Sequence, residues 1–393
     1  MNKKNILVVD DSALMRRLIS DIINSDNRFI VKDLATNGIE GLDYIIKNHA
    51  KYDAVILDVN MPKMNGLELL EQLQKHCIKI TVIMVSTLTK EGAKETIIAL
   101  ERGAFDFITK PENYLEAKEN SFKNRLLDML VVATGVPAVT QAADMSVKET
   151  SRAEKTSMKR QEASSLNSKN NEEKNYVAVN KRMQFAPHKR YTGKKEGKNK
   201  LVALACSTGG PKSLQLVIPK LPANLDAPVI LVQHMPSGFT NSLAQRLNDI
   251  SNVSVKEAAD GDILKKGYVY IAPGGRQMKV CKTNAGYKIA ILDEPARDGL
   301  KPCANIMYES LMNSDYDEIT CVILTGMGAD GTNGIGMLGE KKELYVIAQD
   351  EETSVVYGMP RAIAEAKQVD EVVSLDKIAD AITKNVGVLN NGC

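Results

Sequence analysis

The chain has 393 residues, more than one ordinary hydrophobic core holds, so its length favours two domains and a connecting segment. A net charge of +2 gives no overall field that indicates a nucleic-acid partner or membrane insertion. No apolar run approaches the roughly 20 residues of a membrane span, and the first apolar run, of about four residues, is too short for a secretory signal. Six cysteines without a Cys-x-x-Cys pair favour a reduced, cytoplasmic protein over a disulfide or zinc framework.

Short apolar runs alternate with helical patterns over residues 1–125. We expect strands at Ile6–Val9, Ala54–Leu57, Ile80–Val85 and Phe105–Ile108, and helices at Ser12–Asn24, Leu67–Gln74 and Lys90–Arg102. This alternation predicts a parallel sheet with helices on both faces, which is a doubly wound α/β domain.

The pattern changes over residues 126–198. Lys and Arg outnumber Asp and Glu there, and large apolar side chains are few. Such a segment buries too little apolar surface to offset the entropy lost on ordering, so we predict a flexible basic linker. Its basic pairs Lys181-Arg182 and Lys189-Arg190 leave open whether it is only a tether or also touches an acidic surface.

The alternation resumes at Lys200 and predicts a second parallel-sheet α/β domain over residues 199–393. The expected strands are Leu201–Ala205, Val229–Gln233, Tyr268–Ala272, Lys288–Leu292, Cys321–Leu324 and Tyr345–Ala348. The expected helices are Pro211–Lys220, Thr240–Asp249, Cys303–Asn313, Asp330–Gly339 and Arg361–Ala366. Glycines follow several of these strands, at the carboxyl ends where open parallel sheets bind ligands.

Acidic residues follow two strands of the first domain. Asp10 and Asp11 come after the first strand, and Asp58 comes after a later one. Carboxyl ends of neighbouring parallel strands share one edge of the sheet, so we expect these carboxylates to converge on a hard divalent cation such as Mg²⁺. Ser86 and Lys110 follow two further strands, where a hydroxyl and an ammonium group can contact phosphate oxygens.

This set of residues resembles the receiver domain of two-component response regulators. The likeness is carried by Asp10-Asp11, Asp58, Met61-Pro62-x-Met64-Asn65-Gly66, Ser86 and Lys110-Pro111. It implies a flavodoxin-like fold with Asp58 as the phosphoacceptor and Mg²⁺ bound by Asp10, Asp11 and Asp58. It also implies that Ser86 and Phe107 form a switch pair and that Lys110 contacts the phosphoryl group.

A candidate nucleophile lies in the second domain. Ser207 stands at a strand exit before Gly209-Gly210 and a helix, which exposes its hydroxyl beside main-chain N–H groups. Two glycines also suit a nucleotide phosphate, but neither Gly-x-Gly-x-x-Gly nor Gly-Lys-Ser/Thr is present here. Of the four histidines, His234 alone follows a strand of this domain and is the candidate base. Asp330, in a glycine-rich turn after another strand, is the candidate that orients it, and N–H groups of that turn can serve an oxyanion.

The stretches around these residues resemble the catalytic domain of bacterial chemotaxis protein-glutamate methylesterases. They are Cys206-Ser207-Thr208-Gly209-Gly210, Gln233-His234-Met235-Pro236, Gly238-Phe239-Thr240, Tyr270-Ile271-Ala272-Pro273-Gly274-Gly275 and Thr325-Gly326-Met327-Gly328-x-Asp330-Gly331. The resemblance implies a Rossmann-like three-layer domain in which Ser207 is the nucleophile, His234 the base and Asp330 the orienting acid. The N–H of Met327 then serves the oxyanion.

The same resemblance implies an activity and its partners. The expected reaction is hydrolysis of γ-glutamyl methyl esters, with deamidation of glutamines, on the cytoplasmic helices of chemoreceptors. A chemotaxis histidine kinase is the implied phosphodonor, and ester hydrolysis needs no cofactor. We expect the receiver to cover the cleft of the serine until Asp58 is phosphorylated.

The sequence departs from this family pattern in three places. Cys206 and Asn305 stand where Ala and Asp are usual, and residues 298–303 replace Asn-Gly-His-Arg-Pro-Ser. We expect none of these residues to touch the triad, whereas the middle stretch bears on substrate contacts. Two other functions stay open: a receiver-gated hydrolase of a different ester or amide, and a non-enzymatic regulator. The second domain is unlike the short helix-turn-helix output of a transcription factor.

Overall fold

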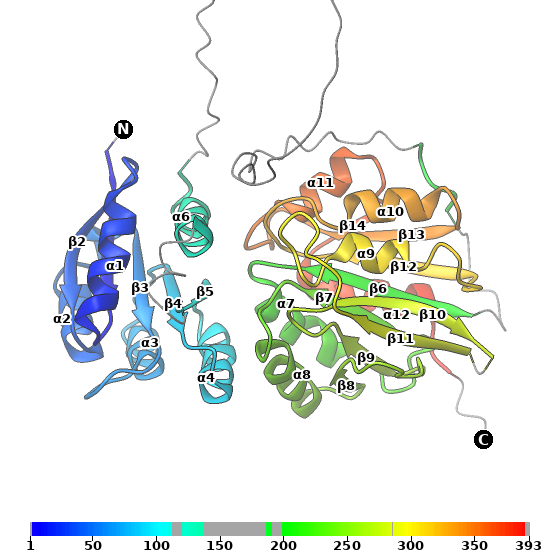
Figure 1. The fold of residues 1–393 in the computed structure, drawn as a ribbon, viewed down its shortest axis with the longest axis horizontal. Coiled ribbons are helices and arrows are strands. Elements are labelled where there is room, and N and C mark those ends of the chain that lie inside the picture. Colours follow the sequence, from blue (N-terminus) through cyan, green and yellow to red (C-terminus); the bar gives the residue numbers. More distant parts are fainter. Residues whose placement is uncertain (1, 112–119, 137–185, 191–198, 285, 390–393) are drawn as a thin grey trace, which may run out of the picture. The chain divides into compact units, whose positions relative to one another are not determined.

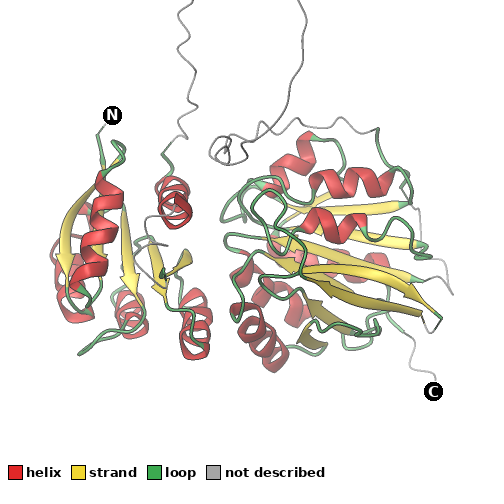
Figure 2. Cartoon of the chain, viewed as in Figure 1, coloured by secondary structure: helices red, strands yellow, loops and turns green. Residues whose placement is uncertain are grey.

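Two parallel sheets, each with helices on both faces, form the body of the protein (Figure 1 and Figure 2). The computed structural model describes residues 2–111, 120–136, 186–190, 199–284 and 286–389. The parallel α/β architecture predicted from the alternation of elements is therefore confirmed for both sheets.

The first domain contains a five-stranded sheet in the order β2-β1-β3-β4-β5, and its neighbouring strands all pair in parallel. Its elements are β1 (Lys4–Val9), α1 (Ala13–Asn24), β2 (Phe29–Ala35), α2 (Gly38–Asn48), β3 (Ala54–Asp58), α3 (Gly66–Lys75), β4 (Val82–Ser86), α4 (Lys90–Glu101), β5 (Asp106–Thr109) and α6 (Asn120–Thr134). From β1 the chain adds β2 on one side of the sheet and then β3, β4 and β5 on the other. The carboxyl ends of β1 and β3 lie side by side at this switch point.

Alternating side chains of β1 supply both faces of the first core. Ile6 and Val8 pack in one cluster with residues of α1 and α6. Val9, on the other face, belongs to a second cluster with Leu69 of α3, and a Cβ atom at Gly41 of α2 would lie 3.0 Å from both methyl carbons of Val9. A strand covered on both faces must be apolar throughout, which is why Ile6–Val9 reads as a continuous hydrophobic run.

The second domain contains a seven-stranded sheet in the order β14-β13-β12-β6-β7-β9-β8, also parallel throughout. Its strands are β6 (Lys200–Cys206), β7 (Val229–Gln233), β8 (Ser254–Glu257), β9 (Tyr268–Ile271), β12 (Glu318–Ile323), β13 (Leu344–Gln349) and β14 (Glu371–Val373). Its helices are α7 (Gly210–Val217), α8 (Phe239–Ile250), α9 (Ala304–Glu309), α10 (Thr332–Gly339), α11 (Met359–Glu365) and α12 (Ile378–Val386).

Helices α9, α10 and α11 cover one face of this sheet, and α7, α8 and α12 cover the other (Figure 1). The sheet order puts β6 between β12 and β7, so the carboxyl ends of these three strands are neighbours. Residues 288–292, predicted as a strand, lie in β11 (Gly286–Leu292). This strand pairs antiparallel with β10 (Gln277–Thr283) in a separate hairpin.

A short piece of the predicted linker, residues 186–190, lies along the edge of the second sheet; we call it the edge segment. Strand β14 pairs only with Ile347–Gln349 of β13. The edge segment covers the opposite end of β13: the Leu344 N–H donates to the Lys189 carbonyl at 2.9 Å, and Arg190 bridges Leu344 in parallel. It therefore occupies an exposed sheet edge that would otherwise present unpaired main-chain groups.

Other parts of the predicted linker either belong to a helix, contrary to the prediction, or lie outside the described residues. Residues 126–134 belong to α6, whereas residues 137–185 and 191–198 are outside the described ranges. Among the helices that the structure describes, none combines the length and apolarity needed to cross a bilayer.

Candidate functional sites

Three carboxylates converge at the switch point of the first sheet. Asp10 and Asp11 follow β1, Asp58 ends β3, and one ligand oxygen from each lies within 4.8 Å of the others. Asp10 and Asp58 are buried, whereas Asp11 is exposed. Burial raises the pKa of Asp58 to about 6, and the Asp10 carboxylate adds to this shift while Lys110 opposes it. Clustered carboxylate oxygens of this kind fit a hard divalent cation.

The remaining predicted residues of this site follow β4 and β5. The ammonium of Lys110 lies 2.7 Å from Asp58 Oδ2 and 2.9 Å from Asp10 Oδ2. Ser86 ends β4, and its hydroxyl donates to the Gly92 carbonyl at 3.2 Å. Phe107 lies in β5, the strand next to β4. The structure thus brings the lysine into contact with the acidic pair and places Ser86 and Phe107 on the two adjoining strands.

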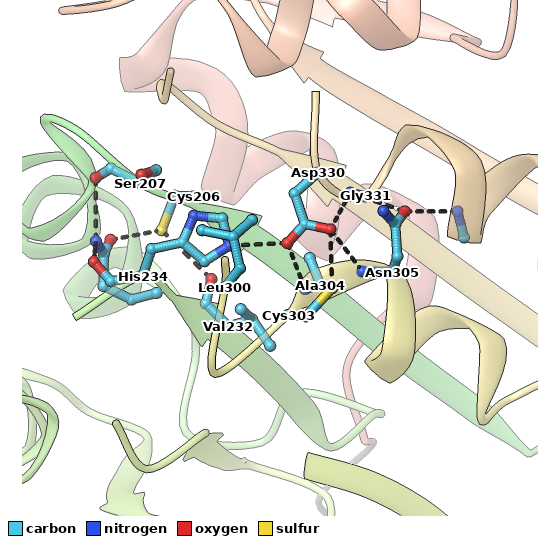
Figure 3. A network of polar contacts seen from close by, with 12 residues as sticks. Cys206, Ser207, Val232, His234, Leu300, Cys303, Ala304, Asn305, Asp330 and Gly331 are labelled. Carbon is cyan, nitrogen blue, oxygen red and sulfur yellow. Dashed lines mark hydrogen bonds and ion pairs between the residues drawn. The ribbon is translucent and has the colours of Figure 1, made fainter. Parts of the chain in front are cut away.

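The second sheet brings a serine, a histidine and an aspartate to the carboxyl ends of its three central strands. Ser207 follows β6, His234 follows β7, and Asp330 lies between β12 and α10. His234 Nε2 lies 2.8 Å from Asp330 Oδ2, and Figure 3 shows the imidazole directed toward that carboxylate. Residues that are 27 and 96 positions apart in the sequence therefore share one edge of one sheet.

Main-chain donors hold the Asp330 carboxylate at the start of α9. Oδ2 accepts from the Ala304 N–H at 2.6 Å, and Oδ1 accepts from the Asn305 N–H at 2.9 Å (Figure 3). Burial acts to raise the pKa of Asp330, but His234 and these two N–H groups lower it below its usual range. An ionised Asp330 can only accept, so Nε2 of His234 carries a proton and donates it. The unprotonated nitrogen of the neutral ring is then Nδ1.

The glycine-rich turn after β12 reaches the serine closely. A Cβ atom at Gly326 would lie 2.8 Å from Ser207 Cβ and 2.4 Å from Met359 Sδ, so this approach requires glycine. The Ser207 N–H donates to the Thr325 carbonyl at 3.0 Å. Within the described ranges, the N–H of Met327 and the hydroxyl of Ser207 have no hydrogen-bond partner. Serine–imidazole hydrogen bonds are often open in enzymes without substrate and tighten when substrate binds.

The expectation that the unusual residues avoid the triad is wrong. The Cys303 thiol donates to Asp330 Oδ1 at 3.3 Å, and burial together with Asp330 raises the pKa of this thiol to about 12. Asn305 contacts Asp330 through its N–H, and its Oδ1 accepts from the N–H of Gly331 at 3.0 Å. These contacts arise because α9 packs its first turn against the loop after β12, a tertiary contact that has no local signal in the sequence.

Three buried glutamines also surround this edge and were not singled out for a role. Gln277 accepts from the Cys303 N–H at 2.9 Å, and Gln349 accepts from the Thr325 N–H at 2.8 Å. Gln233, which precedes His234, donates to the carbonyl of Ser207. All three side chains are at most 1% exposed, and each connects loops that are distant in the sequence.

Comparison with known proteins matches both domains to described families. Residues 6–119 match the response regulator receiver domain, and residues 202–382 match the CheB methylesterase domain. The catalytic domain of Thermotoga maritima CheB methylesterase is 40% identical, and the match covers 47% of this chain and 97% of that one, with a TM-score of 0.45.

Two relatives that match this chain over nearly its full length carry the same name. A protein-glutamate methylesterase/protein-glutamine glutaminase of Oceanobacillus iheyensis is 38% identical over 98% of this chain and 100% of its own length. One of Bacillus subtilis, with the same name, is 38% identical over 97% of this chain and 98% of its own length. The chain therefore belongs to the family of protein-glutamate methylesterases/protein-glutamine glutaminases that carry a response regulator receiver domain.

Proposed function

We propose that this protein is a phosphorylation-activated serine esterase that demethylates γ-glutamyl methyl esters on the cytoplasmic helices of chemoreceptors and deamidates specific receptor glutamines. Family membership supports the reaction class, because the relatives are named for both activities. The observation that carries the catalytic assignment is the 2.8 Å contact between His234 and Asp330 at the sheet edge where Ser207 lies.

Ester hydrolysis begins with attack of Ser207 Oγ on the ester carbonyl carbon. Nδ1 of His234 accepts the hydroxyl proton. The Nε2–H group keeps its hydrogen bond to Asp330, and this bond fixes the tautomer of the ring. The N–H of Met327 donates to the oxyanion. The carbon–oxygen bond to the methoxy group then breaks, and His234 returns the proton so that methanol leaves.

The acyl-enzyme is released by water. His234 accepts a proton from the water as its oxygen attacks the acyl carbonyl, and the bond to Ser207 Oγ breaks with return of that proton. The product is a free glutamate side chain. When the substrate is glutamine, ammonia leaves in place of methanol and the same glutamate results. Apart from water, both reactions use only the residues of this site.

The first domain receives the phosphoryl group on Asp58 from a chemotaxis histidine kinase. Asp10, Asp11 and Asp58 would hold Mg²⁺, which supplies positive charge to the phosphoryl oxygens. The 2.7 Å distance from Lys110 to Asp58 supports a contact of Lys110 with the phosphoryl group, and Ser86 and Phe107 respond as the switch pair. A phosphoryl group adds about −1.5 to −2 charge, enough to reorder the loop after β4 and relieve the block on the serine.

The test is methanol release from methylated chemoreceptor, with and without a small-molecule phosphodonor. Wild type should release methanol faster with the phosphodonor. Ser207→Ala should lower the rate by about 10³–10⁶-fold in both conditions. Asp58→Asn should keep the basal rate and lose the response. An unchanged rate for Ser207→Ala would remove the nucleophile assignment, and a response in Asp58→Asn would remove the phosphoacceptor.

A further inference from the structure

One buried amide side chain joins the main chains of the nucleophile and the base. The β6–β7 ladder ends with Cys206 opposite Gln233, and the His234 N–H still donates to the Cys206 carbonyl at 3.3 Å. Beyond this point the side chain of Gln233, rather than the main chain, links the two strands. Its Nε2 donates to the Ser207 carbonyl at 3.0 Å and to the His234 carbonyl at 3.2 Å. The amide thus adds a cross-link where the two strands part.

The neighbours of Gln233 fix which end of the amide faces which way. Its Oε1 accepts from the Cys206 thiol at 3.0 Å, and burial raises the pKa of that thiol, which keeps it protonated as a donor. Reversing the amide would set Oε1 against two carbonyl oxygens. The fit is also close: a Cβ atom at Gly210 would lie 2.0 Å from Oε1.

The rest of the triad is held elsewhere, which gives this cross-link a specific task. Asp330 and the start of α9 fix the imidazole ring of His234 from one side. In the described residues no hydrogen bond joins the Ser207 hydroxyl to that ring, so their separation depends on the main chains that carry them. Among the described residues, Gln233 is the side chain that hydrogen-bonds both of these main chains.

We infer that Gln233 is a positioning residue of the catalytic site, which sets the distance between the Ser207 hydroxyl and the His234 imidazole through its hydrogen bonds to their carbonyls. This inference rests on the proposed roles of Ser207 and His234. Gln233 is 1% exposed and does not meet substrate, so its loss should lower kcat and leave KM nearly unchanged. A displacement of about 1 Å in a reacting pair costs on the order of 10²-fold in rate.

Gln233→Glu removes both N–H donors at almost constant shape and turns lone pairs toward the two carbonyls. Gln233→Met removes them without adding charge. Gln368→Glu is a matched control, because the amide of Gln368, which is 0% exposed, also donates to two carbonyls, those of Ala186 and Ala366. Gln368 contacts the edge segment and none of the three proposed catalytic residues.

The measurement is inactivation of the full-length protein by phenylmethanesulfonyl fluoride. The oxygen of Ser207 forms a bond to sulfur, fluoride leaves, and the hydroxyl proton passes to His234; peptide mass mapping locates the adduct. We expect Gln233→Glu and Gln233→Met to lower the inactivation rate about 10–100-fold at its high-pH plateau. The apparent pKa of the profile should stay that of wild type. Gln368→Glu should match wild type within about twofold.

Each outcome separates the inference from the proposed function. If wild type is not modified at Ser207, the nucleophile assignment fails. If wild type is modified and the folded Gln233 variants react equally fast, the positioning role fails while the esterase proposal stands. A raised KM with an unchanged kcat on a nitrophenyl ester would also overturn it. Loss of the wild-type circular dichroism spectrum in both Gln233 variants would assign Gln233 to folding instead.

Discussion

Two histidine–aspartate pairs in the second domain have the same contact distance but differ in whether the histidine can accept a proton. In the proposed catalytic site, His234 Nε2 lies 2.8 Å from Asp330; in the edge segment, His188 Nε2 lies 2.8 Å from Asp370. The difference is at the other ring nitrogen. His188 Nδ1 lies 3.2 Å from Gln368 Oε1, which faces the ring because the Gln368 amide donates to Ala186.

With an acceptor at each nitrogen, His188 satisfies both contacts only as the doubly protonated imidazolium. Burial acts to lower its pKa, but the hydrogen bond and charge of Asp370 raise the pKa of His188 above its usual value. Arg190, on the other oxygen of Asp370, acts against that rise. A histidine that must keep both protons is an anchor, whereas no described residue hydrogen-bonds Nδ1 of His234, which is left to accept a proton. The partner of the second nitrogen therefore separates a base from an anchor.

Replacing each aspartate should give the largest contrast between the two pairs. Asp330→Asn loses the charge that fixes the His234 tautomer and sets an amide against the Ala304 and Asn305 N–H groups, so kcat should fall by about 10³–10⁴-fold. Asp370→Asn should stay within about twofold of wild type, because Asp370 contacts His188 and the Val346 N–H but none of the three proposed catalytic residues. The check is hydrolysis of a nitrophenyl ester by folded protein. Comparable losses in both variants would show that the two pairs are not distinct in function.

Asp58 extends the comparison to a buried carboxylate with few donors. Its pKa is raised to about 6 from 3.8, so the folded state loses stability as pH rises between those values and carries the full cost above them. Asp58→Asn should therefore raise the free energy of unfolding around β3 by about 1–3 kcal/mol at about pH 8, and by almost nothing below about pH 4.

The measurement for Asp58→Asn is hydrogen exchange of the β3 amides in chelator-treated buffer, because a bound cation would mask the effect.

Asp330→Asn should change the free energy of unfolding around β12 in the opposite direction. The pKa of Asp330 is lowered, so its ionised form stabilises the fold at neutral pH, and this contribution is lost as pH falls. A gain of stability in both variants would contradict the contrast between a carboxylate short of donors and one surrounded by them.

The anchor itself should give the smallest effect, with a defined direction. Because the folded pKa of His188 is raised, its contribution is complete below the unfolded value of about 6.5 and is lost as pH rises through the folded value. His188→Ala should lower the protection of the Leu344 amide by about 1 kcal/mol at about pH 6, and by less at about pH 9. Hydrogen exchange of that amide at the two pH values tests this. A larger loss at the higher pH would show that His188 binds as the neutral ring.

The sequence predicted the central strands and the strand-exit residues for the same reason. Buried parallel strands such as Val229–Gln233 are continuous apolar runs, and the residue after such a run stands at the carboxyl edge where ligands bind. The edge strand β2 was missed because its alternating exposure admits Lys32 and Asp33, which break the run. Short strands such as β14, with three residues, carry too little pattern to be recognised.

Positioning contacts were beyond the sequence for a different reason. Cys303 meets Asp330, and Gln277 meets Cys303, across separations of 27 and 26 residues that depend on how α9 and β10 pack on the second sheet. A thiol or an amide has no periodic signature, so residue type alone does not distinguish a positioning role from simple burial. The departures from the family pattern at Cys206, Cys303 and Asn305 were nevertheless visible, and all three lie in this network.

The edge segment has a practical consequence for dividing the protein. A fragment that starts at residue 199 would leave the Leu344 N–H and Asp370 without their partners from residues 186–190. Bare strand edges recruit strands from other molecules, so such a fragment is prone to self-association. A fragment that begins upstream of Ala186 keeps the edge segment on β13. It is therefore the natural unit for crystallisation or for measuring the esterase without its receiver.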